Sequence, residues 1–295
     1  MPQAENPSPQ ASFEALTLKR TVLDNGLVFH RVEEGVGVPV VFLHGVLGDW
    51  RTWAPQWAAF VPHFRCISYS RRYSVPNCNR MASPDHSALA EAEDLEALLA
   101  HWQAAPAVLV GASYGAYTAL ALAARRPELI RALILVEPPV MRLADGSAEG
   151  RAIRGDFDCR IRLPARQAFE AGDDARAVWL LTEGILGGTD LGQQSTASMG
   201  RRLENAESLR QVTLSIDEFP ALNMERLSNM DLPALLLSGA RTPPIHDVVF
   251  RALTKALPRA ESHKVPGAGH GVARDQPASF NSLALDFLAR HGLLP

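Results

Sequence analysis

A five-residue segment, Gly111-Ala112-Ser113-Tyr114-Gly115, constrains the fold of this chain more than any other. An apolar run at residues 107–110 precedes it, and a segment rich in helix-forming residues, 116–124, follows it. This pattern predicts a strand, a sharp turn and a helix, with Ser113 at the turn in a strained backbone conformation that exposes its hydroxyl. The small residues on either side of Ser113 allow the strand and the helix to approach each other closely.

The order of strands and helices along the chain predicts a layered α/β protein. The uninterrupted apolar run at 39–43 and the mainly apolar runs at 130–136 and 233–238 are typical of strands that are buried on both faces of a sheet. Helical segments separate these runs, and Ser83 and Pro84 are predicted to be the cap and the first residue of one of them. Strands that alternate with helices at this spacing favour a mostly parallel sheet with helices on both faces.

A long helical segment interrupts this alternation. After Glu137-Pro138-Pro139, residues 140–225 contain helical stretches and no convincing buried strand. We therefore expect a core domain formed by residues 15–139 and 226–295, with a helical cap at 140–225. Residues 1–14 lack the basic start and the apolar stretch of a signal peptide, and we expect them to be a disordered leader.

Composition argues against several classes of function. The chain of 295 residues is 47% hydrophobic and 21% charged, as in ordinary globular proteins. A net charge of −3 provides no basic field for a nucleic acid or an anionic membrane, and no apolar run approaches the roughly 20 residues of a membrane helix. Three cysteines form neither a disulfide framework nor a zinc-ligand spacing. These features predict a cytoplasmic protein with no nucleic-acid or membrane partner.

Three loops with candidate functional residues fall at the carboxyl ends of predicted parallel strands, where open α/β sheets place their sites. They contain His44-Gly45-Val46, the Ser113 turn and Gly267-Ala268-Gly269-His270, in this order. In this combination the chain resembles the α/β-hydrolase superfamily over residues 15–138 and 230–291, with the helical insertion where such proteins carry a cap. The resemblance implies an α/β-hydrolase fold, in which helices flank a mostly parallel central sheet.

The resemblance also implies a role for each matched residue. Ser113 is expected to be the nucleophile and His270 its general base, because a serine hydroxyl is a poor nucleophile at neutral pH unless an imidazole takes its proton. The backbone amides of Val46 and Tyr114 are expected to form the oxyanion hole. His44 is expected to shape its loop rather than to take part in the reaction.

The acid of the expected triad is missing from its usual position. Most relatives hold a carboxylate in the loop after the penultimate strand, but here that loop reads Ser238-Gly239-Ala240-Arg241-Thr242-Pro243-Pro244, with Thr242 where an aspartate is expected. Glu137 ends the strand that follows the Ser113 helix, and its placement resembles that of the acid in the zearalenone-lactonase type. Because an unpaired carboxylate in this apolar segment is costly to bury, Glu137 is the preferred candidate. Asp247, or a site without an acid, is the alternative.

Other residues near these loops have less specific interpretations. Arg71 or Arg72 is expected to order the rear wall of the site by pairing with carbonyls or carboxylates, and the alternative is binding of an acidic substrate. Three aromatic residues after the His44 loop are expected to pack in the core, and the alternative for one of them is a place at the pocket entrance: Trp50, Trp53 and Trp57. Apolar residues of the insertion are expected to form the core of the cap or an apolar lid: Phe157, Phe169, Trp179, Leu180 and Met199.

Together these residues predict a serine hydrolase that cleaves a carboxylic ester or a lactone through an acyl-enzyme on Ser113. A serine rather than an aspartate at this turn disfavours hydrolysis of epoxides and haloalkanes. The cap suggests a small-to-medium, fairly apolar substrate enclosed from bulk water. Neither metal-ligand spacing nor a phosphate-binding loop is visible, so no metal or cofactor is expected. The alternatives are a hydrolase of carbon–carbon bonds in dienoate-type diketones and a ligand-binding protein of the same fold with little turnover.

Overall fold

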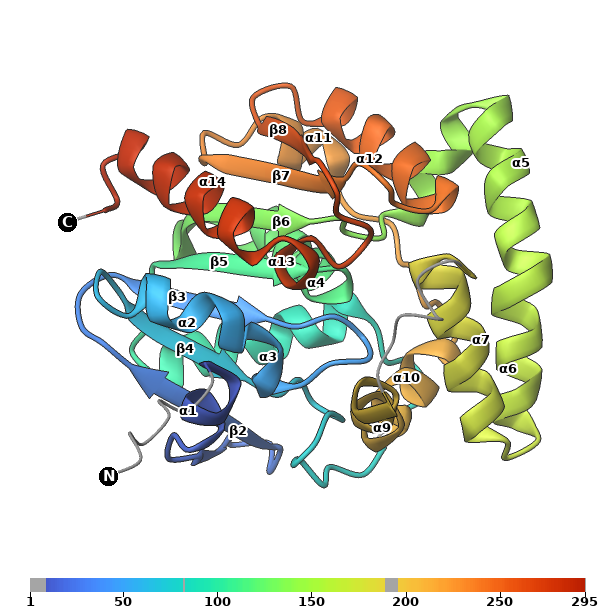
Figure 1. Cartoon of the computed structure of the whole chain (residues 1–295), viewed down its shortest axis with the longest axis horizontal. Coiled ribbons are helices and arrows are strands. Elements are labelled where there is room, and N and C mark those ends of the chain that lie inside the picture. Colours follow the sequence, from blue (N-terminus) through green and yellow to red (C-terminus); the bar gives the residue numbers. More distant parts are fainter. Residues whose placement is uncertain (1–8, 82, 189–195, 295) are drawn as a thin grey trace, which may run out of the picture.

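The computed structural model describes residues 9–81, 83–188 and 196–294, and their strands form a single sheet (Figure 1). The strands are β1 (Lys19–Val22), β2 (Val28–Glu34), β3 (Pro39–Leu43), β4 (Arg65–Tyr69), β5 (Ala107–Ala112), β6 (Ile130–Val136), β7 (Ala234–Gly239) and β8 (Glu261–Val265). Their order across the sheet is β1-β2-β4-β3-β5-β6-β7-β8. Strands β3 to β8 are parallel, whereas the β1–β2 hairpin at one edge pairs antiparallel with β4. The predicted mostly parallel sheet is confirmed.

Helices from both ends of the chain and from the crossovers between strands flank this sheet (Figure 1). Among the described residues, no helix combines the length and the apolar character that crossing a bilayer requires. The flanking helices are α1 (Pro9–Glu14), η1 (Trp50–Trp53), α2 (Ala54–Phe60), α3 (Ala88–His101), α4 (Tyr114–Arg125), η2 (Pro127–Leu129), α11 (Met224–Ser228), α12 (Pro244–Ala256), α13 (Val272–Asp275) and α14 (Pro277–Arg290).

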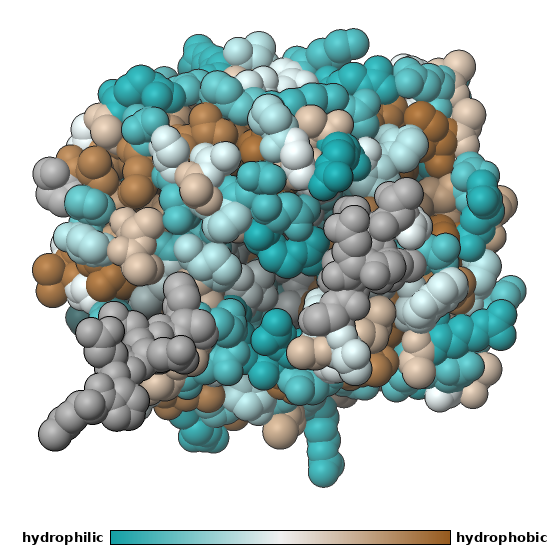
Figure 2. All heavy atoms as spheres, viewed as in Figure 1, coloured by the Kyte–Doolittle hydropathy of each residue, from teal (hydrophilic) through white to brown (hydrophobic). Residues whose placement is uncertain are grey.

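Alternate residues of the strands pack on opposite faces of the sheet, as the two-residue period of a strand requires. Val41 and Leu43 of β3 belong to a hydrophobic cluster that includes residues of α3, α4 and α12. Val40 and Phe42 belong to a second cluster, with residues of α1, α2 and α14. Strand β3 is therefore buried on both faces, while hydrophilic side chains cover much of the surface seen in Figure 2.

The segment between β6 and β7 is helical, and residues 140–188 and 196–225 contain no strand. Its helices lie beyond the ends toward which the arrows of β5 and β6 point in Figure 1. Several of them share a hydrophobic cluster of their own, which includes Phe169, Leu181 and Leu209. The division into a core and a cap at residues 140–225 stays a prediction. The helices are η3 (Met141–Gly146), α5 (Ala148–Phe157), a π-helical turn η4 (Asp158–Arg162), α6 (Leu163–Glu170), α7 (Asp174–Leu186), α9 (Thr196–Glu204) and α10 (Ala206–Thr213).

The expected disordered leader is wrong for residues 9–14, which form helix α1. The Phe13 ring is buried, and it stacks on Trp50 with a centroid distance of 5.4 Å and meets the edge of Trp57 at 4.8 Å. Burial of one aromatic ring provides the apolar contact that orders this short segment. Residues 1–8, which belong to the same expectation, lie outside the described residues.

The predicted start of α3 is also wrong, because Ser87 and not Ser83 caps this helix. The Ser87 hydroxyl accepts the amide of Leu89, whereas the Ser83 hydroxyl accepts the amide of Asp85 at 3.2 Å in the preceding loop. The carbonyl of Pro84 accepts the amide of Ile216, a residue that follows α10. This contact with a distant segment holds residue 84 outside the helix, and nothing in the local sequence indicates it.

Candidate active site

Ser113 lies at the turn between β5 and α4 with φ 51° and ψ −120°, in the left-handed region that a serine rarely adopts. Its amide donates to the carbonyl of Val136 at 2.8 Å, which fixes the turn to the end of β6. A Cβ atom on Gly115 would lie 2.4 Å from the carbonyl oxygen of Leu43, so only glycine fits there. The local sequence therefore produces the strained turn that it predicts.

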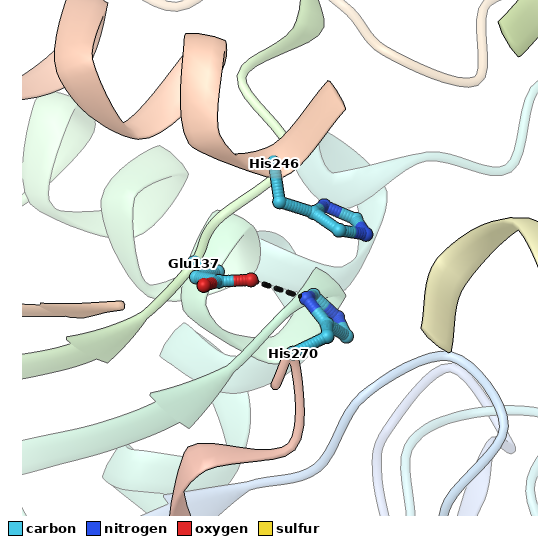
Figure 3. A group of neighbouring side chains, drawn as sticks. All are labelled: Glu137, His246 and His270. Atoms are coloured by element: carbon cyan, nitrogen blue, oxygen red, sulfur yellow. Dashed lines mark hydrogen bonds and ion pairs between the residues drawn. The ribbon is translucent and has the colours of Figure 1, made fainter. Parts of the chain in front are cut away.

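The structure brings His270 and Glu137 into contact (Figure 3). The imidazole Nδ1 lies 2.6 Å from Oε2 of the carboxylate, and both side chains are buried. Glu137 directly follows β6, and His270 lies in the loop between β8 and α13. Because an ionised carboxylate only accepts hydrogen bonds, Nδ1 carries the proton and Nε2 is left as the basic ring nitrogen.

The Glu137 carboxylate accepts four hydrogen bonds. Oε1 accepts from the hydroxyl of Ser238 at 2.7 Å and from the amide of Gly239 at 2.9 Å. Oε2 accepts from the hydroxyl of Thr242 at 2.7 Å and from His270. Burial raises the pKa of the Glu137 carboxyl, but the hydrogen bond and charge of His270, with smaller contributions from other neighbours, keep that pKa below its usual value. The group is therefore ionised at neutral pH.

Sequence reasoning missed the contribution of Ser238 and Thr242. Thr242 stands where an aspartate is expected, and in the structure it donates to the carboxylate that reaches this place from the neighbouring strand. The available signal in the sequence for these hydrogen bonds is a serine at the end of an apolar strand, Ser238, and a threonine in the loop that follows, Thr242. Asp247, the alternative acid, lies in α12 and pairs with Arg251 and Lys264 rather than with His270.

A second histidine, His246 of α12, lies face to face with His270 (Figure 3). The ring centroids are 3.9 Å apart and the planes differ by 21°. Nε2 of His246 donates to the carbonyl of Ile185 in α7 at 3.1 Å. Burial, and then the charge of His270, lower the pKa of His246 to about 3. His246 is therefore neutral at the pH of most cells, and no local motif marks it.

Among the described residues, one group could hold a metal ion by proximity alone, namely Glu137, His246 and His270, whose ligand atoms lie within 4.8 Å of one another. The hydrogen bonds of these side chains already occupy Oε2 of Glu137, Nδ1 of His270 and Nε2 of His246. The nitrogen lone pairs of His246 and His270 lie in the planes of their rings, and these rings are stacked. The two lone pairs therefore do not point to a common position within the about 2 Å of a metal–nitrogen bond. The geometry favours a hydrogen-bonded group over a metal centre.

Replacement of His246 by phenylalanine is expected to make stability less sensitive to acid. The pKa of His246 is 6.5 in the unfolded reference and about 3 in the folded protein. Between these values the unfolded chain binds a proton that the folded protein does not, so stability falls as the pH decreases. Urea denaturation at about pH 7 and pH 5 gives the free energy of unfolding at each pH. Between these two values, the free energy of unfolding of His246→Phe should fall by on the order of 1–2 kcal/mol less than that of the wild type.

The matched control for this measurement is His101→Phe, because His101 is exposed at the end of α3. This variant removes an imidazole from the surface and leaves His246 in place, so it should keep the pH dependence of the wild type. An unchanged pH dependence in His246→Phe would show that the folded protein holds this imidazole in its ordinary titration range.

A cavity of about 270 Å³ contains both Ser113 and His270 in its wall. Val46 lines the same cavity, and Tyr114 is the first residue of α4. The Tyr114 side chain is buried, and its hydroxyl donates to the carbonyl of Glu218 at 3.1 Å. The remaining wall includes parts of η1, α7, α9 and the segment after His270: Trp53, Thr182, Ile185, Leu186, Ser198, Arg201, Arg202, Val272 and Arg274.

The apolar residues suggested as a lid do not line this cavity. Phe169 is buried in the hydrophobic cluster of the insertion, and Leu180 and Met199 pack against the same cluster. Phe157 packs against the core cluster, and Trp179 is 48% exposed. The structure therefore agrees better with the interpretation that most of these residues pack inside the protein than with the interpretation that they form an apolar lid.

Arg71 and Arg72 pair with carboxylates, as expected, and neither lines the cavity. Arg71 is buried and pairs with Glu91 at 2.7 Å, and Arg72 pairs with Asp94 at 2.6 Å. His44 donates from Nδ1 to the carbonyl of Gly45 and accepts the Arg71 amide at Nε2. Burial and the charge of Arg71 lower the pKa of His44 to about 4, so this imidazole is a neutral link between two loops.

The parallel sheet and the strained serine turn define a protein with the α/β-hydrolase fold. The chain belongs to the alpha/beta hydrolase family, because the model of that family matches residues 40–283. It is 28% identical over 257 residues to the sn-1-specific diacylglycerol lipase ABHD11 of Mus musculus, covering 85% of this chain and 80% of that protein.

Two solved structures share this fold. A thermophilic esterase from Thermogutta terrifontis superposes with a TM-score of 0.73 at 18% identity, over 93% of this chain and 99% of that one. The enol-lactonase from Burkholderia xenovorans LB400 superposes with a TM-score of 0.73 at 19% identity, over 92% of this chain and 100% of that one. At these identities the likeness concerns the fold alone.

Proposed function

We propose that the protein hydrolyses a carboxylic ester or a lactone through an acyl-enzyme on Ser113. One observation carries the proposal: the 2.6 Å hydrogen bond between His270 and Glu137, beside a cavity that also exposes the strained serine. Ester-type chemistry is further supported by the similar proteins, which include a lipase, an esterase and an enol-lactonase.

The proposed reaction begins when Oγ of Ser113 attacks the substrate carbonyl and its proton passes to Nε2 of His270. The Glu137 carboxylate holds the ring through Nδ1 and stabilises the positive charge that the imidazole gains. The amides of Val46 and Tyr114 would donate to the oxyanion, and loss of one such donor typically costs roughly 3–4 kcal/mol of transition-state stabilisation.

His270 would then return the proton to the alcohol oxygen, whose bond to the acyl carbon breaks as the tetrahedral intermediate collapses to the acyl-enzyme. A water molecule then attacks the acyl-enzyme and gives a proton to the same ring nitrogen, which passes it to Oγ of Ser113 as the bond between Oγ and the acyl carbon breaks and the acid is released. Residues 140–225 would act as a cap, since α7 and α9 supply one wall of the cavity. A covered site of this volume suits a small substrate and shields the intermediate from bulk water.

A substrate panel tests this proposal with the wild-type protein. We expect hydrolysis of short p-nitrophenyl esters or of simple lactones, followed by absorbance or by titration of the released acid. Cleavage of a dienoate-type diketone in place of both would identify the alternative carbon–carbon hydrolase. Binding of these compounds without turnover of any of them would contradict the proposal and identify a ligand-binding protein.

A further inference from the structure

His246 places a second imidazole against the proposed general base. Its ring lies face to face with that of His270, with the centroids 3.9 Å apart and the planes inclined by 21° (Figure 3). His270 lines the cavity and His246 does not, so His246 lies outside the wall that a substrate would touch. The proposed reaction assigns no step to His246, although this side chain is only 4% exposed and packs on the base.

The position of the His246 ring is fixed by contacts other than the one with His270. Its Nε2–H donates to the carbonyl of Ile185 at 3.1 Å. Ile185 is the next-to-last residue of α7, where a carbonyl has no amide partner within the helix, so His246 caps α7 from α12. Ile245 and Val249, on either side of His246 in α12, are buried in the core cluster and anchor the backbone that carries the ring.

The short segment from Thr242 to His246 supports both members of the Glu137–His270 pair. Thr242 donates to Oε2 of Glu137 at 2.7 Å, and His246, four residues later, covers one face of His270. The amide of His246 donates to the carbonyl of Pro243 at 3.0 Å, which fixes the backbone between the two side chains. One segment therefore faces the carboxylate and the imidazole together.

The hydrogen bond to Glu137 does not by itself fix the orientation of the His270 ring. It holds Nδ1 at 2.6 Å from the carboxylate, but χ2 of a histidine has a broad energy profile. A tilt of the ring about this contact would move Nε2, the atom proposed to take the proton of Ser113. A second ring packed on one face of His270 opposes that tilt. Because His246 is neutral, its face also attracts the positive charge that His270 would gain, as aromatic faces attract cations.

We propose that His246 is a positioning residue, which holds the ring of His270 in its reactive orientation by stacking on it. This inference rests on the proposed reaction and adds to it a residue that touches neither the substrate nor the reacting oxygen. Loss of the stacked ring should lower kcat, because a misplacement of about 1 Å at the reacting atoms can cost roughly a hundredfold in rate. KM should stay nearly unchanged, because His246 is not part of the cavity wall.

Two substitutions separate the stacked ring from the hydrogen bond to α7. His246→Phe keeps an aromatic ring and removes the donor to Ile185, whereas His246→Gln keeps an amide donor and removes the ring. With a p-nitrophenyl ester, we expect kcat of His246→Gln to fall roughly tenfold to a hundredfold at nearly constant KM, and kcat of His246→Phe to stay close to that of the wild type. Wild-type kcat in His246→Gln would overturn the inference, and so would an equal loss in both variants.

The matched control is Leu253→Val, because Leu253 is buried in the same helix, about two turns beyond His246, and does not line the cavity. This variant weakens the packing of α12 and should lower the unfolding temperature without a change in kcat. If Leu253→Val lost as much kcat as His246→Gln, the effect would come from general loosening of α12, and the role assigned to the ring would be wrong.

Proton NMR separates this inference from the proposed function. The Nδ1 proton of His270 lies in a short hydrogen bond to a carboxylate, so we expect a downfield signal that is absent in His270→Gln. Its exchange with water should be slow in the wild type and in His246→Phe, and severalfold faster in His246→Gln, where the ring leaves Glu137 more often. Equal exchange rates in these three proteins would overturn the inference and leave ester hydrolysis intact. If no ester is hydrolysed, the proposed reaction fails, and the exchange rates still decide whether His246 positions the ring.

Discussion

Replacement of Ser113 by alanine is expected to lower kcat for a p-nitrophenyl ester by roughly three orders of magnitude or more. The variant removes the oxygen that would form the acyl-enzyme, while the cavity and the His270–Glu137 hydrogen bond remain. Steady-state kinetics give the loss of activity. Mass spectrometry after treatment with a fluorophosphonate should show one added group on Ser113 in the wild type and none in Ser113→Ala.

Ser279→Ala is the matched control for this experiment, since Ser279 is exposed in α14 and should be replaceable without effect. Circular dichroism and thermal unfolding must show that Ser113→Ala is folded. Wild-type turnover in a folded Ser113→Ala protein would mean that another group attacks the substrate, and the proposed mechanism would then be wrong.

Replacement of Glu137 by glutamine is expected to reduce kcat by roughly a thousandfold or more with a small effect on folding. The amide has the size of the carboxylate, so its oxygen can still accept from Ser238 and Gly239. Its NH₂ group would donate to Nδ1 of His270 and favour the tautomer with the proton on Nε2. That tautomer cannot take the proton of Ser113, and the neutral amide does not stabilise an imidazolium.

The comparison variant is Asp247→Asn, which removes the charge of the other candidate acid. Asp247 pairs with Arg251 and Lys264, so its loss should leave kcat close to that of the wild type. Measurement of kcat and of the unfolding temperature for both variants distinguishes a reactive role from a structural one. Equal activity of Glu137→Gln and the wild type would remove Glu137 from the proposed triad.

The sequence predicts those parts of the fold and the candidate site that depend on local patterns. Strands β5 and β6 follow from apolar runs, and the turn at Ser113 follows from glycines that permit close packing. The position of Glu137 beside His270 follows from the parallel sheet, because the ends of neighbouring strands lie at one edge. The missing aspartate at position 242 was the signal that directed attention to Glu137.

The features that the sequence does not predict depend on contacts between distant segments. The start of α3 is fixed in part by the contact between Pro84 and Ile216. The donation of Thr242 to Glu137 and the stacking of His246 on His270 require side chains from separate elements to meet. Arg202 lines the cavity because α9 packs against α7 and α10, whereas the sequence of α9 resembles that of an ordinary polar helix.

The end of β6 controls two of the groups proposed to react. The carbonyl of Val136 accepts the amide of Ser113, and the next residue, Glu137, donates its amide to the carbonyl of Leu237. Small movements of the sheet therefore shift the hydroxyl and the carboxylate in concert, and their spacing is preserved. Helices α7 and α9 of the insertion lie outside this sheet, so substitutions at their cavity-lining residues would change which molecules the cavity accepts more than they change the spacing of Ser113 and Glu137.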